Sequence, residues 1–483
     1  MVPRRTLVVT AFLFLAIVSS GQQGSDLQQR TAQLASSVFT GPSMGTLREL
    51  TDGFGGRLTG SASYDRSTEW AAAKFRSFGI ANVRRELFPI PNGWQRGLAR
   101  GQMIAPLQRP LYLQSLGWTP STPAGGVNGE VVLVSDISSE NIKAHAGDLK
   151  GRIVLLDTEK IFADGFRKAF AQLHLSYPLL KDAGALAVLY PDRAPNNVLN
   201  ATDADWGAAV KALPVAQLGM EDAKLVRRLL ERGPVKLAFE LQNQITGPTQ
   251  VSNVIAEIRG SERPDEWILI GAHLDSWDYG TGAQDNGTGT AMVLEAARAL
   301  ALGKPPRRSL RFALWGGEEQ GLLGSTAYVA AHAQELANCV AVLNADNGAG
   351  HPKGWKVQGR KDLQEALQPL SKSLLGDLIG GEISLEVTYD TDHGPFMLQG
   401  IPSLDLLVDM AHYAEVHHKA SDTYDKVDGL DFKAGAALLT VTAYAIAQAD
   451  QPIAPHLDHA AVGEILKKAA LDQFLVDMGI WKP

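Results

Sequence analysis

Short apolar runs alternate with amphipathic stretches over the second half of the chain. The runs end in polar residues, which is typical of strands buried on both faces of a parallel sheet. Segments with apolar residues at helical spacing lie between them, and Asn286 is the expected N-cap of the first. This alternation predicts an α/β domain with a mostly parallel mixed sheet flanked by helices. The expected strands are 252–258, 266–272, 309–315, 339–346 and 400–408, and the expected helices are 289–301 and 322–336.

An intervening stretch, residues 127–241, has a different pattern. Short β-rich runs alternate there with helical segments, and the helix expected over 220–233 places Leu225, Leu229 and Leu230 on one apolar face. Pro- and Gly-containing segments flank the stretch on both sides. We therefore expect a β-rich domain inserted into the α/β domain. The expected division is an N-terminal part of the α/β domain over 22–125, the inserted domain over 126–246, the main part over 247–450 and a C-terminal tail over 451–483.

The N-terminus has the layout of a secretory signal. Arg4 and Arg5 precede an apolar run from Leu7 to Val18, and small residues follow this run. The run falls short of the roughly 20 residues that a membrane-spanning helix needs. We therefore expect a signal peptide over 1–21, an exported protein that is secreted or periplasmic, and no membrane contact after the signal is removed.

Composition and charge narrow the class of protein. An apolar content of 45% with 20% charged residues is typical of a globular chain. The formal net charge of -7 argues against a nucleic-acid partner, which would require a basic surface. Cys339 is the single cysteine, so the chain has no disulfide framework, and its apolar surroundings predict a buried thiol.

Acids and histidines fall where the expected strands end. Because the carboxyl ends of parallel strands meet at one edge of a sheet, these side chains are expected to converge there. So many charged groups beside apolar strands indicate a metal site. The residues are His273, Asp285, Glu318, Glu319, Asp346 and His418.

The mixture of side chains favours zinc. Imidazole and carboxylate ligands suit Zn²⁺, and the set exceeds what one tetrahedral ion requires. A pair of ions sharing a carboxylate would use them all. Asp285 is the expected bridge because its glycine-rich loop leaves the backbone free to reach a crowded site. Asp275 is placed to accept the second N–H of His273, and Glu318 is left free as a general base.

The motifs that carry these residues resemble those of the dizinc exopeptidase family of the aminopeptidase Y and carboxypeptidase Q type, with the carboxypeptidase Q branch nearest. The resemblance runs from Pro248 to about Gln448 in the family's order. The segments GDLKGRIVLLD and LPVAQLG further resemble the protease-associated domain inserted in the same relatives. The motifs are GAHLDSWDYGTGAQDNGTG, LWGGEEQGLLGS, NADNG and HHKASDT.

The resemblance implies an enzyme that hydrolyses peptide substrates with metal-activated water and two Zn²⁺ per chain. It favours His418 over His417, because His418 and Asp422 fit the family's His-x-x-x-Asp-Thr pattern. It also implies a cis peptide bond between Asp285 and Asn286. The implied roles are His273 and Asp346 as ligands of one zinc, Glu319 and His418 as ligands of the other, Asp285 as the bridge, Glu318 as the base, Asp275 as the orienter of His273 and His393 as a candidate donor to the oxyanion.

Several functions stay open at this point. A carboxypeptidase Q-like dipeptidase or carboxypeptidase and an aminopeptidase of the same family use the same metal residues. A one-zinc glutaminyl cyclase and a non-catalytic, receptor-like binding protein are the alternatives from other classes. The basic residues Arg259, Arg360 and Lys361 cannot be placed in a pocket, so the sequence does not say which peptide end is trimmed. A homodimer is also left open.

Overall fold

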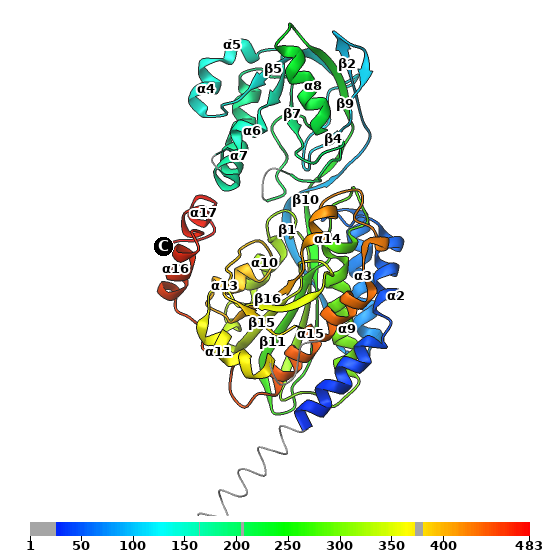
Figure 1. The fold of residues 1–483 in the computed structure, drawn as a ribbon, viewed down its shortest axis with the longest axis vertical. Coiled ribbons are helices and arrows are strands. Elements are labelled where there is room, and N and C mark those ends of the chain that lie inside the picture. The colour runs from blue at the N-terminus through cyan, green and yellow to red at the C-terminus, as the bar shows by residue number, and fades with distance from the viewer. Residues whose placement is uncertain (1–25, 164, 204–206, 372–379) are drawn as a thin grey trace, which may run out of the picture.

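The described part of the chain forms two eight-stranded sheets, one above the other in Figure 1. The computed structural model describes residues 26–163, 165–203, 207–371 and 380–483. The expected signal peptide over 1–21 lies outside these residues.

The first sheet is mixed, with a parallel centre. β12, β11, β13 and β16 run parallel, whereas β1 and β10 are antiparallel to each other at one side and β14 is antiparallel to β16 at the other. This agrees with the mixed α/β fold that the strand–helix alternation predicts. The strands are, in order across the sheet, β1 (Asn82–Gln95), β10 (Gln244–Ile258), β12 (Arg308–Trp315), β11 (Arg263–His273), β13 (Cys339–Asn344), β16 (Ser403–Val408), β14 (Pro352–Lys356) and β15 (Glu382–Ser384).

The central strand shows why its sequence is a continuous apolar run. Ile268 and Ile270 of β11 pack into the core on one face, and Trp267 and Leu269 pack into a separate core on the other. Both faces are covered, so neither needs polar residues. Helices α2 (Ser43–Phe54), α3 (Ala62–Ser77), α9 (Thr288–Ala301), α11 (Lys361–Leu370) and α15 (Gly429–Gln448) contribute to the first core, and α10 (Leu323–Ala331) and α13 (Gly394–Met397) contribute to the second.

The helix α15 has the length and apolar composition of a membrane span. In the structure 83% of its apolar window is buried, and the helix packs against α9 and β11. Its composition is therefore explained by its place in the core.

Some helix ends differ from the sequence prediction. The helix α9 begins at Thr288 with Gly287 at the cap position, so Asn286 is not the N-cap. The Asn286 side chain still accepts a 2.9 Å hydrogen bond from the amide of Gly289, which is the kind of bond that made it a candidate. The helix expected over 322–336 ends at Ala331.

The second sheet belongs to residues 96–243, the stretch between β1 and β10 that we call the insertion. The chain leaves the first sheet along β1 and returns along β10, where Gln95 pairs with Gln244. Strands from Ala99 onward already belong to the second sheet, whereas the sequence placed the start of this unit at 126. Its strands are, in order, β3 (Arg109–Pro110), β2 (Ala99–Ala105), β9 (Lys236–Leu241), β5 (Val127–Val134), β6 (Ile153–Leu156), β7 (Ala187–Pro191), β8 (Val215–Leu218) and β4 (Leu113–Ser115).

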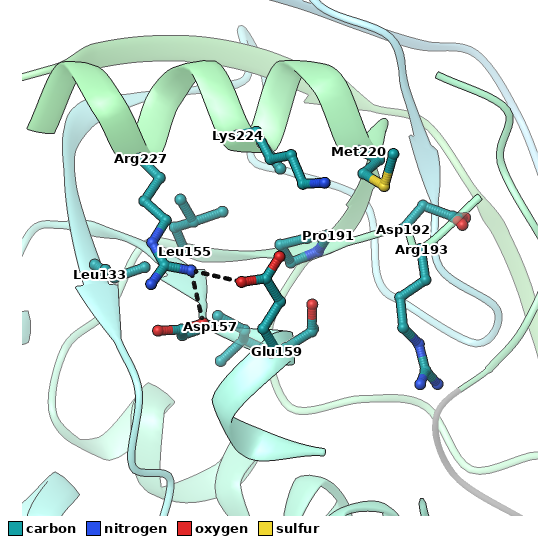
Figure 2. Close-up of a pocket in the computed structure, with 13 residues that line it drawn as sticks. Leu133, Leu155, Asp157, Glu159, Pro191, Asp192, Arg193, Met220, Lys224 and Arg227 are labelled. Carbon is teal, nitrogen blue, oxygen red and sulfur yellow. Dashed lines mark hydrogen bonds and ion pairs between the residues drawn. The ribbon is translucent and has the colours of Figure 1, made fainter. Parts of the chain in front are cut away.

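Strands β5 to β8 of the insertion are parallel and carry helices on both faces. The helices are α4 (Ser139–Ala144), α5 (Ala146–Leu149), α6 (Thr158–Ile161), α7 (Phe166–Asp182) and α8 (Met220–Leu230). A pocket of about 270 Å³ lies at the carboxyl ends of β6 and β7. Figure 2 shows Arg227 of α8 paired there with Asp157 at 3.1 Å and with Glu159 at 3.2 Å. Leu133, Leu155 and Pro191 also line the pocket, and the charges of Arg227, Asp157 and Glu159 are paired within the insertion.

The expected C-terminal tail is folded. It forms α16 (His459–Lys468) and α17 (Asp472–Asp477), which bury Leu466 and Leu475. These helices share a core with Leu322 and Tyr389, two residues of the first domain. Leu322 also lines the cavity at the end of the first sheet.

Candidate metal centre

Three neighbouring strands bring the predicted residues to one edge of the first sheet. His273 is the last residue of β11, and it lies opposite Trp315 at the end of β12. Glu318 and Glu319 follow β12 in the next turn, and Asp346 follows the end of β13. Because β12, β11 and β13 are parallel, their carboxyl ends place these side chains together.

One half of the cluster surrounds His273. Its Nε2 atom lies 3.0 Å from Asp346 Oδ1, 3.2 Å from Asp285 Oδ1 and 3.8 Å from Glu318 Oε2. His273 is fully buried, so this imidazole faces three carboxylates away from bulk water. Ligand atoms of His273, Glu318 and Asp346 all lie within 4.8 Å of one another, which is close enough to hold one metal ion.

The other half surrounds His418. Its Nε2 atom lies 3.0 Å from Glu319 Oε2 and 3.2 Å from Asp285 Oδ2. Asp285 therefore directs one oxygen to His273 and the other to His418. His417 also points to Asp285, with 3.4 Å between Nε2 and Oδ2. The peptide bond between Asp285 and Asn286 is cis, as the resemblance implied.

Two residues hold the glycine-rich loop that carries Asp285. Asp422 accepts hydrogen bonds from the amides of Gln284 at 2.7 Å and Asp285 at 3.1 Å. Arg57, which is fully buried, donates to the carbonyls of Leu274, Thr281 and Gly282 at 2.7 to 2.8 Å. Arg57 is not predicted from the sequence, since a lone arginine in a loop carries no spacing signal.

Asp275 lies against both His273 and the turn that carries the two glutamates. The Nδ1 atom of His273 lies 3.0 Å from the carbonyl oxygen of Asp275 and 3.6 Å from its carboxylate. The carbonyl is thus the closer partner of the imidazole. The carboxylate accepts a 2.9 Å hydrogen bond from the Thr59 hydroxyl and lies 3.4 Å from the amides of both Glu318 and Glu319. Asp275 therefore positions the turn that carries both glutamates.

His393 is not part of the cavity. It is fully buried, its Nε2 atom lies 3.1 Å from the carbonyl oxygen of Thr388, and it is absent from the described residues that line the site. A donor to an oxyanion must reach the reacting carbonyl. The structure therefore does not support the candidate role of His393.

Burial and crowding shift the proton affinities of the cluster. Burial raises the pKa of Glu318 well above its usual range, and the negative charge of Asp346 adds to this shift. Burial also raises the pKa of Glu319 to about 7, with Asp285 contributing. Burial acts against the protonated form of His418, but Glu319 and Asp285 raise its pKa to about 10. The raised pKa values of the two glutamates and of His418 indicate an excess of negative charge in this buried site.

The cluster opens into a cavity of about 340 Å³. This volume lies within the roughly 300–1,000 Å³ that small-ligand pockets usually have. Besides the cluster, its walls include Leu322, Met410 and Tyr413, which offer apolar surface next to the polar floor. The cavity therefore has the form of a ligand pocket with charged residues at its floor.

The donor set fits divalent metal ions. Imidazole nitrogens and carboxylate oxygens are the ligands that zinc accepts, and Asp285 has an oxygen for each half of the cluster. A cation between these groups would also offset the crowding of carboxylates that raises the pKa of Glu318. Held there, metal ions supply a Lewis acid and an acidified water, which is the chemistry of hydrolysis.

Comparison with known proteins identifies relatives of the chain. Residues 253–442 match peptidase family M28. Carboxypeptidase Q from Mus musculus is 29% identical over 413 residues, which cover 83% of this chain and 85% of that protein. The crystal structure of a peptidase M28 precursor from Shewanella amazonensis SB2B has a TM-score of 0.77 at 28% identity and covers 90% of this chain and 100% of that one. A zinc aminopeptidase from Bacillus subtilis shares the fold, with a TM-score of 0.66 at 21% identity over 86% of this chain and 97% of that one.

The matched segment and the metal centre coincide. Residues 253–442 include the whole cluster from His273 to His418 as well as Asp422, which holds the loop of Asp285. The longer matches extend the likeness over most of both sheets. The part of the chain that carries the metal centre is therefore similar to peptidase family M28.

Proposed function

We propose that this chain is an exported exopeptidase that hydrolyses dipeptides or short peptides at a two-zinc centre. The chain is a metallo-exopeptidase by its family and its carboxypeptidase Q relatives. The number of ions and the role of each residue are our inference. The observation that carries it is the carboxylate of Asp285, whose two oxygens lie 3.2 Å from His273 and 3.2 Å from His418.

In this proposal the cluster is divided between two ions. His273 and Asp346 hold one zinc, Glu319 and His418 hold the other, and Asp285 is shared by both. The distances within each half support this division, since His273 is closest to Asp346 and His418 is closest to Glu319. Asp275 acts as the positioning residue for the glutamate turn.

Glu318 is the proposed general base. It lines the cavity, and it is the carboxylate of the cluster that the two-zinc division leaves without a ligand role. Zinc ions held at the cluster would supply an acidified water and a Lewis acid for the peptide carbonyl. Glu318 takes the proton of the attacking water and delivers it to the leaving amine.

Two alternatives from other classes fit the cluster less well. A one-zinc cyclase would leave two of the acids and one histidine without a function in a buried site. A receptor-like protein without metal would leave the same acids crowded around His273 with nothing to balance them. The complete set of side chains therefore favours a peptidase with two ions.

The insertion and the N-terminus have proposed roles as well. We assign residues 96–243 to an inserted domain of the protease-associated type, with boundaries at the ends of β1 and β10. This moves the start of the domain forward from residue 126, because β2, β3 and β4 belong to the second sheet. Residues 1–21 are the proposed signal for export, and a homodimer stays a prediction.

The proposal is tested with purified protein and a chelator. We expect hydrolysis of Leu-Ala by the metal-loaded protein, loss of activity after treatment with a chelator, and recovery when Zn²⁺ is added back. Recovery should follow the second equivalent of zinc rather than the first. Hydrolysis that survives complete removal of metal would contradict the proposal.

A further inference from the structure

The cavity at the metal centre carries an excess of negative charge. Five carboxylates line it, and none of its described lining residues is a lysine or an arginine. Four of these carboxylates belong to the proposed two-zinc centre, where two divalent ions balance their charge. The fifth is Asp390, which has no part in that centre. Even a fully loaded site therefore keeps one uncompensated negative charge.

Asp390 is a free acid held in a fixed place. Its carboxylate is exposed and forms no hydrogen bond or ion pair with any residue that the structure describes. The residues beside it are anchored, since Tyr389 is buried against the C-terminal helices and Thr391 accepts a 3.1 Å hydrogen bond from Asn344. The backbone thus presents this acid to the cavity, where a group on the substrate can reach it.

A cation near Asp390 does not change this balance. The charge of Asp390 acts on Lys356, but the ammonium group of Lys356 lies 3.5 Å from Asp405. The Lys356 side chain is only 10% exposed and does not line the cavity. Because Lys356 is already paired, it is not available to bind a substrate carboxylate.

An exopeptidase must recognise one charged end of its substrate. A terminal carboxylate is usually bound by arginine or lysine, whereas a terminal ammonium is bound by acids. Resting on the proposed function, we infer that this site takes the amino end of a peptide, and that Asp390 accepts the α-ammonium group of the first residue. A carboxylate at the same place would meet a like charge. Asp390 is thus a specificity residue for a free amino terminus.

The bond that breaks follows from this orientation. Water adds to the carbonyl carbon of the first residue, and the bond from that carbon to the next nitrogen breaks. The first residue leaves as an amino acid with a new carboxylate, and the proton held by Glu318 goes to the amine of the remaining peptide. A free carboxyl terminus is not needed for this step, although the named relatives include carboxypeptidase Q.

Three matched substrates test the inference with the metal-loaded protein. Leu-Ala has both charged ends, Leu-Ala-amide lacks the carboxylate, and N-acetyl-Leu-Ala lacks the ammonium. We expect similar kcat/KM values for the first two. We expect a value about 10- to 100-fold lower for the third, the usual range for loss of a charge-assisted contact. The inference is overturned if the acetylated dipeptide is cleaved faster than the amide.

A substitution tests the residue itself. Asp390→Asn should raise KM for Leu-Ala-amide by about 10-fold or more, change kcat less, and leave the bound zinc unchanged. Asp390→Glu should recover part of the affinity. Glu386→Gln is the matched control, because Glu386 is an exposed acid on the same segment that does not line the cavity. An unchanged KM in Asp390→Asn would remove Asp390 from this role.

The results separate this inference from the proposed function. If none of the three substrates is cleaved by protein with two bound zinc ions, the proposed function fails. If the acetylated dipeptide is cleaved and the amide is not, the exopeptidase function stands and the inference alone fails.

Discussion

The backbone amide of Ala201, in the insertion, donates a 2.7 Å hydrogen bond to the carbonyl of His418. Beside it, Asn200 and Lys419 form an antiparallel bridge. His418 has a φ of 60°, in the left-handed region that side chains other than glycine rarely adopt. The insertion therefore holds the backbone of a proposed zinc ligand in an unfavourable conformation, which links the second sheet to the metal centre.

Aromatic rings make a second link between the insertion and His418. Its imidazole is 6.0 Å from the ring of Trp277, and Trp277 is 6.3 Å from Trp118 in the insertion. Arg96 fixes the same loop, with its guanidinium 2.9 Å from Asp278 and 4.4 Å from the ring of Tyr279. The loop after β11 thus packs against the insertion on one side and the metal centre on the other.

Arg96→Ala should therefore reduce activity from a distance. Loss of the pair with Asp278 frees the loop that packs on His418, and a small misplacement of a reacting group typically costs about 10- to 100-fold in rate. We expect kcat to fall by this factor in a protein that still folds. Zinc should be bound more weakly at the half of the cluster around His418. Arg100→Ala is the control, because Arg100 is 73% exposed and pairs with Glu240 on the second sheet. Equal effects of both variants would contradict this link.

Glu318→Gln should separate metal binding from catalysis. The amide keeps the shape of the side chain but cannot take a proton from water, so we expect kcat to fall by about 10²- to 10⁴-fold. The zinc content should stay at the wild-type level, measured by elemental analysis after gel filtration. Glu319→Gln is the comparison, since it should lose zinc as well as activity. Full activity in Glu318→Gln would rule out Glu318 as the base.

The metal-free protein should become less stable as the pH rises. Burial raises the pKa of Glu319 to about 7, with help from Asp285, so the folded chain holds a proton that the unfolded chain has released. The free energy of unfolding should then fall between about pH 4.5 and about pH 7. Urea denaturation of chelated protein across this range measures it. Glu319→Gln should show a shallower fall, and an identical pH dependence in both proteins would contradict the assignment.

Arg57→Met should destabilise the loop of Asp285. The substitution removes the Arg57 donor from the carbonyls of Leu274, Thr281 and Gly282, of which the Gly282 carbonyl keeps the amide of Gly287. One carbonyl left without a donor costs about 1–3 kcal/mol. We expect the free energy of unfolding to fall by at least about 2 kcal/mol, measured by urea denaturation. The exposed Arg66→Met serves as control, with a change within about 0.5 kcal/mol. A stable Arg57→Met protein with normal zinc binding would show that the loop does not need this brace.

The sequence predicts the parallel centre of the first sheet well, because its strands are buried on both faces. Apolar runs such as 266–272 stand out from the polar residues around them, and the acids that follow mark the strand ends. The strands β14 and β15 are not predicted, because both are short and mixed in polarity and β15 has one open side. For the same reason the start of the insertion was placed at 126 instead of near Ala99.

The roles of single residues were harder to predict than the cluster itself. The resemblance implies His393 as a candidate donor to the oxyanion, but its ring turns to the Thr388 carbonyl. The spacing assigns Asp275 to His273. Its carboxylate also contacts the turn that carries both glutamates, and the spacing does not predict this contact. Arg57 donates to backbone carbonyl groups, and every residue has one, so the sequence does not identify these partners. Such contacts depend on how loops fold back, and strand periodicity does not report this.

The metal content of the purified chain tests the central claim most directly. Elemental analysis of the zinc-loaded protein should give two zinc ions per chain, and Asp285→Ala should lose both, because this carboxylate faces His273 and His418 alike. The exposed Asp265→Ala, outside the cluster, should keep both ions. One zinc per chain, or an Asp285→Ala protein that keeps two, would contradict the account.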